Sequence, residues 1–229
     1  MEKLYYLINP DFIGRDRFIE VMMQLGYRLK VRKNYHRTTR SLSWNFPNLI
    51  KGMLVDAPNK VWQSDITYFH VGDRYYYGVF IIDVYTKRIV GHQVSDHMMA
   101  SANIKALKAA IKQNQAPQYH HSDRGAQYGA CQYLELLSKN GTKVSMGEKA
   151  QDNAYAERIN GTIKNEYINY WKPKNFQQLR KMVNRAVKQY NTKRLHKSLK
   201  RETPEGFEQK WFRGILSPKP LITIFNKVE

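Results

Sequence analysis

Three acidic residues stand in sequence contexts where a carboxylate needs a partner or a chemical role. Asp65 lies within residues 61–70, a β-branched and aromatic run that predicts a strand. Asp123 ends a second short strand-like run, directly before a glycine turn. Glu157 lies near the start of a helical pattern that opens after an Asp-Asn pair at 152–153. Because acids are rare in strands and costly to bury alone, Asp65 and Asp123 indicate a functional site.

Three carboxylates in one pocket would repel one another unless cations held them together. Mg²⁺ or Mn²⁺ suits an all-carboxylate site, because hard cations take oxygen ligands and keep coordination positions open for water and phosphate. Two such ions can activate an attacking oxygen and stabilise the leaving oxygen when a phosphodiester is displaced. The acids therefore predict a site for two divalent ions, held by Asp65, Asp123 and Glu157.

The segment that carries Glu157 has the pattern of an amphipathic helix. A buried stripe is predicted at Ala156, Ile159, Ile163 and Tyr167. The adjacent face would present Glu157, Asn160, Gly161 and Lys164. Taken alone, this is an ordinary amphipathic helix. Glu157 belongs to a functional site only if the fold brings Asp65 and Asp123 close to it.

These acids stand in motifs that resemble those of bacterial insertion-sequence transposases of the OrfB or OrfAB type, which carry a retroviral-integrase-like DDE core. The motifs are Trp62-x-x-Asp65-Ile-Thr-Tyr, His121-Ser-Asp123-Arg-Gly-x-Gln127-Tyr and Asp152-Asn-Ala-x-Ala-Glu157. The family's C-terminal signature is matched by Tyr190-Asn191, Arg194-x-His196-x-Ser198-Leu199 and Thr203-Pro204. The resemblance covers roughly residues 11 to 208. Between Asp123 and Glu157 lie 33 residues, fewer than is usual in the family, and the loop 147–151 is the expected site of the shortening.

The resemblance implies an α/β protein with an RNase H-like mixed sheet, helices on both faces, and basic arms that are mostly helical or irregular. It implies metal-dependent cleavage at transposon ends, followed by strand transfer of the freed 3′-hydroxyl into DNA. Asp65 would bridge both ions, and Asp123 and Glu157 would each complete one. The resemblance also implies a copy-out, paste-in pathway, a homo-oligomer on DNA and an upstream partner protein with a helix-turn-helix.

Two other functions stay open at this point. A nuclease on the same core would cut DNA without joining it. A non-enzymatic DNA-binding remnant of a decayed transposase is the second alternative, because the resemblance implies a DNA-binding helical segment that residues 1–59 match only in part.

Basic side chains are the candidates for contacts with DNA. Lys164 would reach DNA beside the scissile phosphate, although without the resemblance a solvated lysine would be the simpler interpretation. The segment 28–40 packs six basic residues without an acid, as a DNA-contacting arm or a plain solvated loop would. The full set of predicted DNA-contacting residues is Lys164, Arg158, Asn160, Arg28, Lys30, Arg32 and Lys33.

The charge of the chain also points to nucleic acid. Its 229 residues hold 38 Lys and Arg against 19 acids, a net charge of +19. Residues 1–59 carry a net +5, residues 60–169 a net +3, and residues 170–229 a net +11. A near-balanced core between basic flanks suits an enzyme held on DNA by its edges. No apolar run is long enough to span a membrane and no signal peptide opens the chain, so we expect a cytoplasmic, nucleoid-associated protein.

The pattern of elements predicts three divisions: a basic N-terminal arm and linker over 1–59, the catalytic core over 60–170, and a basic helical extension with a tail over 171–229. A two-residue turn at Gly72-Asp73 predicts a hairpin. Helices are expected over 13–25, 100–114, 128–140 and 176–190. The tail from Trp211 has too few anchors to be placed.

Several other polar residues receive structural predictions. Asp83 is expected to anchor the turn that follows its strand, and the pair His120-His121 is expected to pack within a strand. Cys131, the single cysteine, excludes a disulfide framework and is expected in the core. Glu148 and Glu166 are expected to be solvated.

Overall fold

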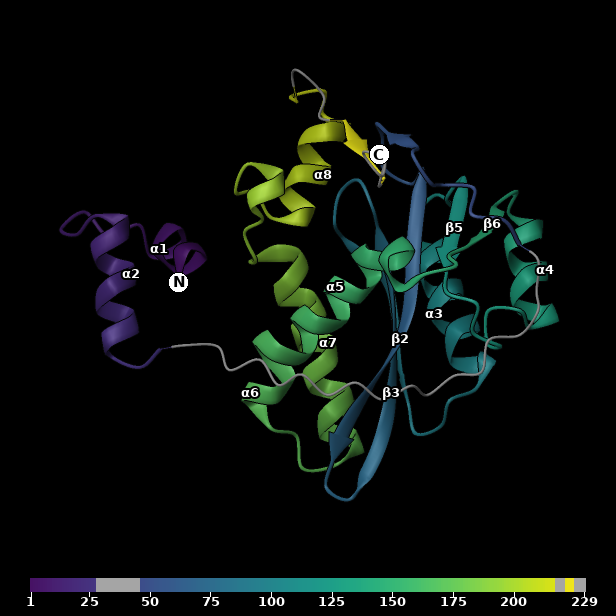
Figure 1. Ribbon diagram of the computed structural model, residues 1–229, viewed down its shortest axis with the longest axis horizontal. Helices are drawn as coiled ribbons and strands as arrows, with labels where there is room; N and C mark the ends of the chain where they lie inside the picture. The colour runs from purple at the N-terminus through teal and green to yellow at the C-terminus, as the bar shows by residue number, and fades with distance from the viewer. Residues whose placement is uncertain (28–45, 217–220, 225–229) are drawn as a thin grey trace.

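A mixed five-stranded sheet forms the centre of the molecule (Figure 1). The computed structural model describes residues 1–27, 46–216 and 221–224. Strands β2 (Val61–Val71), β3 (Arg74–Asp83) and β4 (Ile89–Ser95) form an antiparallel meander. Strands β5 (Tyr119–Ser122) and β6 (Lys143–Met146) extend it in parallel, giving the order β4-β3-β2-β5-β6.

The hairpin between β2 and β3 forms at the predicted turn. Val71 pairs with Arg74 across it, and Gly72 has φ 60, a left-handed conformation that glycine adopts without a steric penalty. The close turn fixes the register of the two long strands, so that Asp65 lies opposite Phe80.

Helices cover both faces of the sheet, as predicted. The first face carries α5 (Ala154–Thr162), the π-helical turn η2 (Ile163–Ile168), α6 (Asn169–Trp171) and α7 (Phe176–Thr192). The second face carries α3 (Ala100–Gln113) and α4 (Cys131–Lys139). Successive strand residues point to opposite faces, so Phe80 packs in the first cluster and Ile81 in the second. The predicted stripe of α5 and η2 packs in the first cluster through Ala156, Ile159, Ile163 and Tyr167.

The C-terminal helices α7 (Phe176–Thr192) and α8 (Pro204–Phe212) pack against the rest of the core. The buried side of α7 belongs to the first-face cluster through Leu179, Val183, Ala186, Val187 and Tyr190. A third cluster joins α8 (Pro204–Phe212) to the short pair β1 (Leu54–Val55) and β7 (Ile222–Thr223). Trp211 packs against this cluster, which places part of the tail that the sequence left unplaced. The predicted boundaries near 60 and 170 stay predictions.

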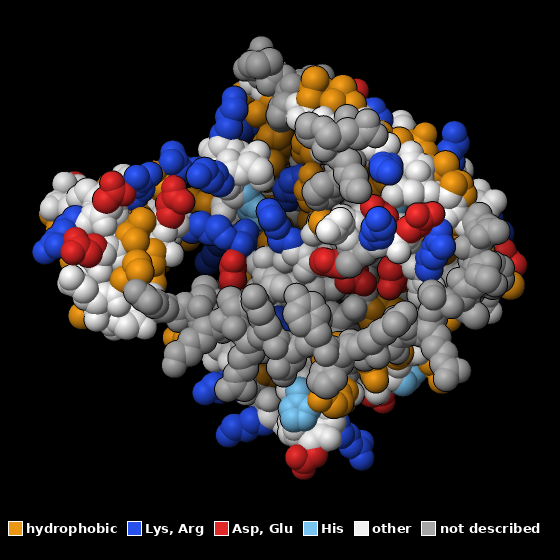
Figure 2. Space-filling model, in the orientation of Figure 1, with side chains coloured by type: hydrophobic (Ala, Val, Ile, Leu, Met, Phe, Trp, Pro, Cys, Tyr) orange, Lys and Arg blue, Asp and Glu red, His pale blue; other side chains and the backbone are white. Residues whose placement is uncertain are grey.

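Two helices precede the core, α1 (Glu2–Ile8) and α2 (Arg15–Gln24), the second at the predicted position. Lys3 and Tyr6 of α1 contact Glu166 and Arg201, respectively. The space-filling view shows Lys and Arg side chains gathered where these helices approach the rest of the molecule (Figure 2). The predicted arm residues Arg28, Lys30, Arg32 and Lys33 lie outside the described part of the chain.

One core prediction is wrong. Cys131 is exposed rather than buried. It is the first residue of α4, and the buried side of that helix is formed by Tyr133 and Leu137 instead.

Candidate active site

Asp65 is held within β2 on the first face of the sheet. Its Oδ1 accepts a hydrogen bond from the Ile66 amide at 2.9 Å, and its Oδ2 accepts one from Asn160 Nδ2 at 2.8 Å. Burial, followed by repulsion from the carboxylates of Asp123 and Glu157, raises the pKa of Asp65 to about 7. The protein therefore holds a carboxyl group that is only partly ionised near neutral pH.

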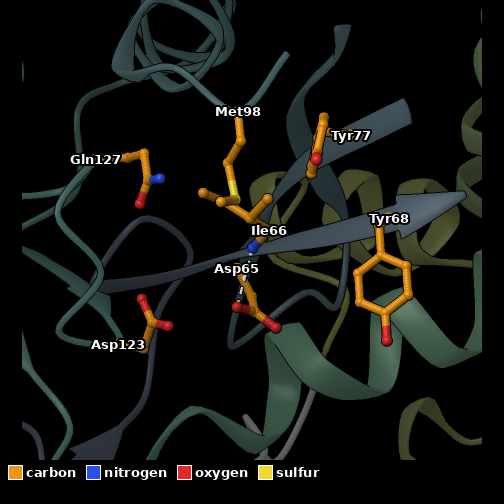
Figure 3. A pocket seen from close by; sticks show the side chains of 7 residues that line it. All are labelled: Asp65, Ile66, Tyr68, Tyr77, Met98, Asp123 and Gln127. Atoms are coloured by element: carbon orange, nitrogen blue, oxygen red, sulfur yellow. Dashed lines mark hydrogen bonds between the residues drawn. The ribbon is translucent and has the colours of Figure 1, made fainter. Parts of the chain in front are cut away.

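Asp123 follows the last residue of β5, where the chain leaves the sheet. Its Oδ1 accepts a hydrogen bond from the Gly125 amide at 3.1 Å, and burial raises its pKa. It lines a pocket with Asp65, and Figure 3 shows the two carboxylates on different sides of this pocket. Gln127 and Met98 complete the wall above them.

Glu157 lies in α5, which packs on the same face of the sheet as Asp65. Burial and repulsion from Asp123 raise the pKa of Glu157. Repulsion from Asp123 thus acts on both Asp65 and Glu157, and repulsion from Glu157 acts on Asp65. Within residues 1–27, 46–216 and 221–224, no three side chains of the His, Cys, Asp and Glu types stand close enough to hold a metal ion. The two-ion site accordingly stays a prediction.

The predicted DNA-contacting residues of α5 and η2 differ in how far their side chains are buried. Asn160 is buried against Asp65. The Lys164 Nζ stands 4.3 Å from the ring centroid of Tyr68. Burial lowers the pKa of this lysine, and attraction to Asp65 partly opposes the change. Arg158 is exposed and lines an open groove together with Glu157.

Glu166 was expected to be solvated, and that prediction is wrong. Its two carboxylate oxygens accept hydrogen bonds from Nε and Nη2 of Arg194, both at 2.6 Å, and Lys3 Nζ lies 3.4 Å away. Burial alone would raise the pKa of Glu166, but the hydrogen bonds and charges of Arg194 and Lys3 together outweigh it and lower the pKa. The two residues are 28 positions apart, so helical periodicity gives no sign of the pair.

The structural predictions for the other polar residues are confirmed. Asp83 accepts hydrogen bonds from the amides of Thr86 and Asn59 at 2.7 and 2.6 Å, which anchors the turn. His120 and His121 are buried in β5, where they bond to Tyr133 and Ser145. In the part of the chain that the structure describes, no helix is both long and apolar enough to cross a membrane.

The chain matches two models of the integrase core domain, over residues 55–151 and 140–204. It is 33% identical over 212 residues to the insertion element IS600 uncharacterized 31 kDa protein of Shigella sonnei, covering 89% of this chain and 78% of the relative. It is 32% identical over 212 residues to the transposase of insertion sequence element IS904 from Lactococcus lactis, covering 89% of this chain and 81% of the relative. The chain belongs to the insertion-sequence transposases with an integrase core domain. It is therefore a DDE-type polynucleotidyl transferase that acts in DNA transposition, and the two alternative functions are not favoured.

Solved structures support the fold of this transposase. The HTLV-2 integrase catalytic core domain, solved in complex with magnesium, superposes with a TM-score of 0.56 at 20% identity, covering 66% of this chain and 97% of that one. A chain of the simian T-cell lymphotropic virus intasome, in complex with the PP2A regulatory subunit B56 gamma, gives a TM-score of 0.60 at 15% identity and covers 100% of this chain and 78% of that one. These likenesses confirm the RNase H-like fold expected from the sequence.

Proposed function

We propose that Asp65, Asp123 and Glu157 hold two Mg²⁺ or Mn²⁺ ions, and that this transposase uses them to cut transposon ends and join them to target DNA. The observation that carries the proposal is that Asp65 and Asp123 line one pocket and that Glu157 projects from α5, which packs on the same face of the sheet. Burial, followed by repulsion from Asp123 and Glu157, raises the pKa of Asp65 to about 7. Divalent cations would offset the repulsion among these groups and would find the oxygen donors they prefer. The three carboxylates would supply the oxygen ligands of the ions.

When bound, the ions would supply Lewis-acid stabilisation of the attacking and the leaving oxygen. The chain's own residues would set the geometry. Asn160 would orient Asp65 through its hydrogen bond, and Lys164, beside Asp65, would bind a phosphate of the transposon end. Arg158, exposed in the groove next to Glu157, would follow the DNA backbone away from the site.

The reaction would consist of two displacements at phosphorus. In the first, water forms a bond to phosphorus and the bond to the 3′-oxygen breaks, which leaves a 3′-hydroxyl at the transposon end. In the second, that 3′-oxygen forms a bond to phosphorus in target DNA and displaces another 3′-oxygen. The number of phosphodiester bonds is conserved in the second step, so joining needs no external energy source.

We infer that the transposase works as a homo-oligomer on DNA in the bacterial cytoplasm, and that Arg28, Lys30, Arg32 and Lys33 form a DNA-contacting arm. An upstream partner with a helix-turn-helix would supply recognition of the ends.

The test is an assay of cleavage and strand transfer on duplex oligonucleotides that carry the inverted repeats flanking the element. We expect Asp65→Asn, Asp123→Asn and Glu157→Gln each to abolish both reactions and to leave DNA retention in a gel nearly unchanged. Asp73→Asn, in the exposed hairpin turn, is the matched control and should behave like the wild type. A wild-type protein that cuts but never joins would be a nuclease, and full activity of any triad variant would remove that residue from the site.

A further inference from the structure

We propose that Gln63 and Asn153 are positioning residues, which fasten the start of α5 to β2 and so set where Glu157 stands relative to Asp65. We call the hydrogen bonds made by these two side chains the clasp. The inference rests on the proposed function, because it concerns the same site.

Gln63 bonds to the chain on both sides of the point where α5 begins. Its Nε2 donates to the Asp152 carbonyl at 3.2 Å, and its Oε1 accepts from the Tyr155 amide at 3.1 Å. The side chain is fully buried, at 0% exposure. Side chains two apart on a strand share a face, so Gln63 and Asp65 both point towards α5. One amide group on β2 therefore fixes both the entry and the first turn of the helix.

Asn153 provides the second connection. Its Nδ2 donates to the Ser64 carbonyl at 2.8 Å, and the residue is 3% exposed. The parallel pairing of β2 with β5 ends at Gln63, since Gln63 and His121 are the last partners in this ladder. The Ser64 carbonyl lies directly beyond that point, where β5 turns away towards Asp123. The side chain of Asn153 thus supplies a donor where the strand ladder no longer does.

The clasp and the bond to Asp65 enclose Glu157 between two fixed points. Asn153 reaches the Ser64 carbonyl and Asn160 reaches the Asp65 carboxylate. Asn153 directly precedes α5 and Asn160 lies in its last turn, so α5 is held to β2 at both of its ends. Glu157 lies between them. A shift at the start of α5 would therefore move Glu157 relative to Asp65.

The side-chain oxygen of Asn153 bears on the role of this residue. Its Oδ1 is buried and has no hydrogen-bond partner among the described residues. A buried acceptor without a partner destabilises the fold. The hydrogen bond from Nδ2 to the Ser64 carbonyl, next to Asp65, is therefore the contact through which this side chain acts.

The test compares Gln63→Met and Asn153→Ala with a matched control in the full chain. Thr142→Val is that control, because Thr142 Oγ1 is likewise a buried donor to a backbone carbonyl, that of Pro117, at 2.8 Å. Thr142 precedes β6 and Pro117 precedes β5, so this bond lies at the opposite end of these parallel strands from Asp123. Gln63→Met preserves the shape of the side chain and carries the test if Asn153→Ala does not fold.

The probe is Mn²⁺ alone, without DNA. Calorimetry measures the affinity of each protein for Mn²⁺, and urea unfolding measures the free energy of unfolding of the same proteins. We expect all three variants to lose stability, but only the clasp variants to bind Mn²⁺ about tenfold more weakly, which is the lower end of the loss typical when outer-shell partners of metal ligands are removed. Added Mn²⁺ should restore strand transfer to the clasp variants and not to Glu157→Gln.

Clasp variants that bind Mn²⁺ within about twofold of the wild type would overturn the inference and leave the triad intact. Equal weakening in Thr142→Val would overturn it as well, because the effect would then be one of stability. A wild-type affinity that Asp65→Asn does not change would instead refute the proposed function, and the clasp with it.

Discussion

Asn160 of α5 donates a hydrogen bond from Nδ2 to Oδ2 of Asp65 on β2, at 2.8 Å. The bond joins a helix residue to a strand residue 95 positions earlier in the chain. It favours the ionised form of Asp65, against the burial and the neighbouring carboxylates that raise its pKa to about 7. This single contact thus affects both the orientation and the charge of a predicted metal ligand.

The first prediction concerns pH. A metal ion binds the ionised carboxylate, so Mn²⁺ affinity should rise as pH increases through about 7, where Asp65 loses its proton. Asn160→Ala removes a bond that lowers the Asp65 pKa, so the rise should move to higher pH. Calorimetric titrations with Mn²⁺ between pH 6 and 9 would measure the shift. Asn165→Ala, which among the described residues loses a side-chain bond to Asn169, should leave the curve in place. The same curve for both variants would contradict the role given to Asn160.

The second prediction concerns Lys164. Removal of one cation that pairs with a phosphate should weaken binding of transposon-end DNA by about 1–3 kcal/mol. Lys164→Ala should therefore bind the ends less tightly and slow both chemical steps. Lys139→Ala, exposed at the end of α4, is the control. Fluorescence anisotropy across a salt titration would compare the two variants, and equal affinities would show that Lys164 does not bind the ends.

The third prediction treats α7 as part of the core. Leu179 is fully buried in the first-face cluster, so Leu179→Ala should reduce the free energy of unfolding by about 2–5 kcal/mol. Lys181→Ala, on the exposed side of the same helix, should change it by less than about 0.5 kcal/mol. Urea unfolding measures both. A small loss for Leu179→Ala would contradict the assignment of this side of α7 to the core.

The fourth prediction concerns stability in acid. Burial, followed by repulsion from His121, lowers the pKa of His120 from 6.5 to about 3. The unfolded chain takes up this proton below about 6.5 and the folded chain does not, so stability is present above pH 6.5 and declines towards pH 3. His120→Gln, which can still bond to Tyr133, should show a shallower decline in urea unfolding between pH 7 and 4. His70→Gln, at an exposed position of β2, should follow the wild type. Parallel curves for all three proteins would rule out His120 as a source of acid sensitivity.

The sequence by itself determined the main helices and strands, and a sheet with helices on both of its faces. The β-branched and aromatic runs over β2 and β3, the Gly72-Asp73 turn and the stripe at Ala156, Ile159 and Ile163 are local patterns, and these predicted elements formed close to their expected bounds. The acid motifs pointed to the insertion-sequence transposases in the same way. These signals can be read along the chain because a strand or a helix repeats its environment every two or 3.6 residues.

Only the tertiary structure decided which polar groups meet. Glu166 and Arg194 are 28 residues apart, and Gln63 lies 89 residues before Asp152. Pairing between Leu54 and Thr223 placed a tail that showed no pattern of its own. Cys131 followed a helical pattern and still faced outward, because the packing of α4 placed Tyr133 and Leu137 inside. Such contacts depend on how whole elements pack against one another, and periodicity within one element carries no information about the partner it will meet.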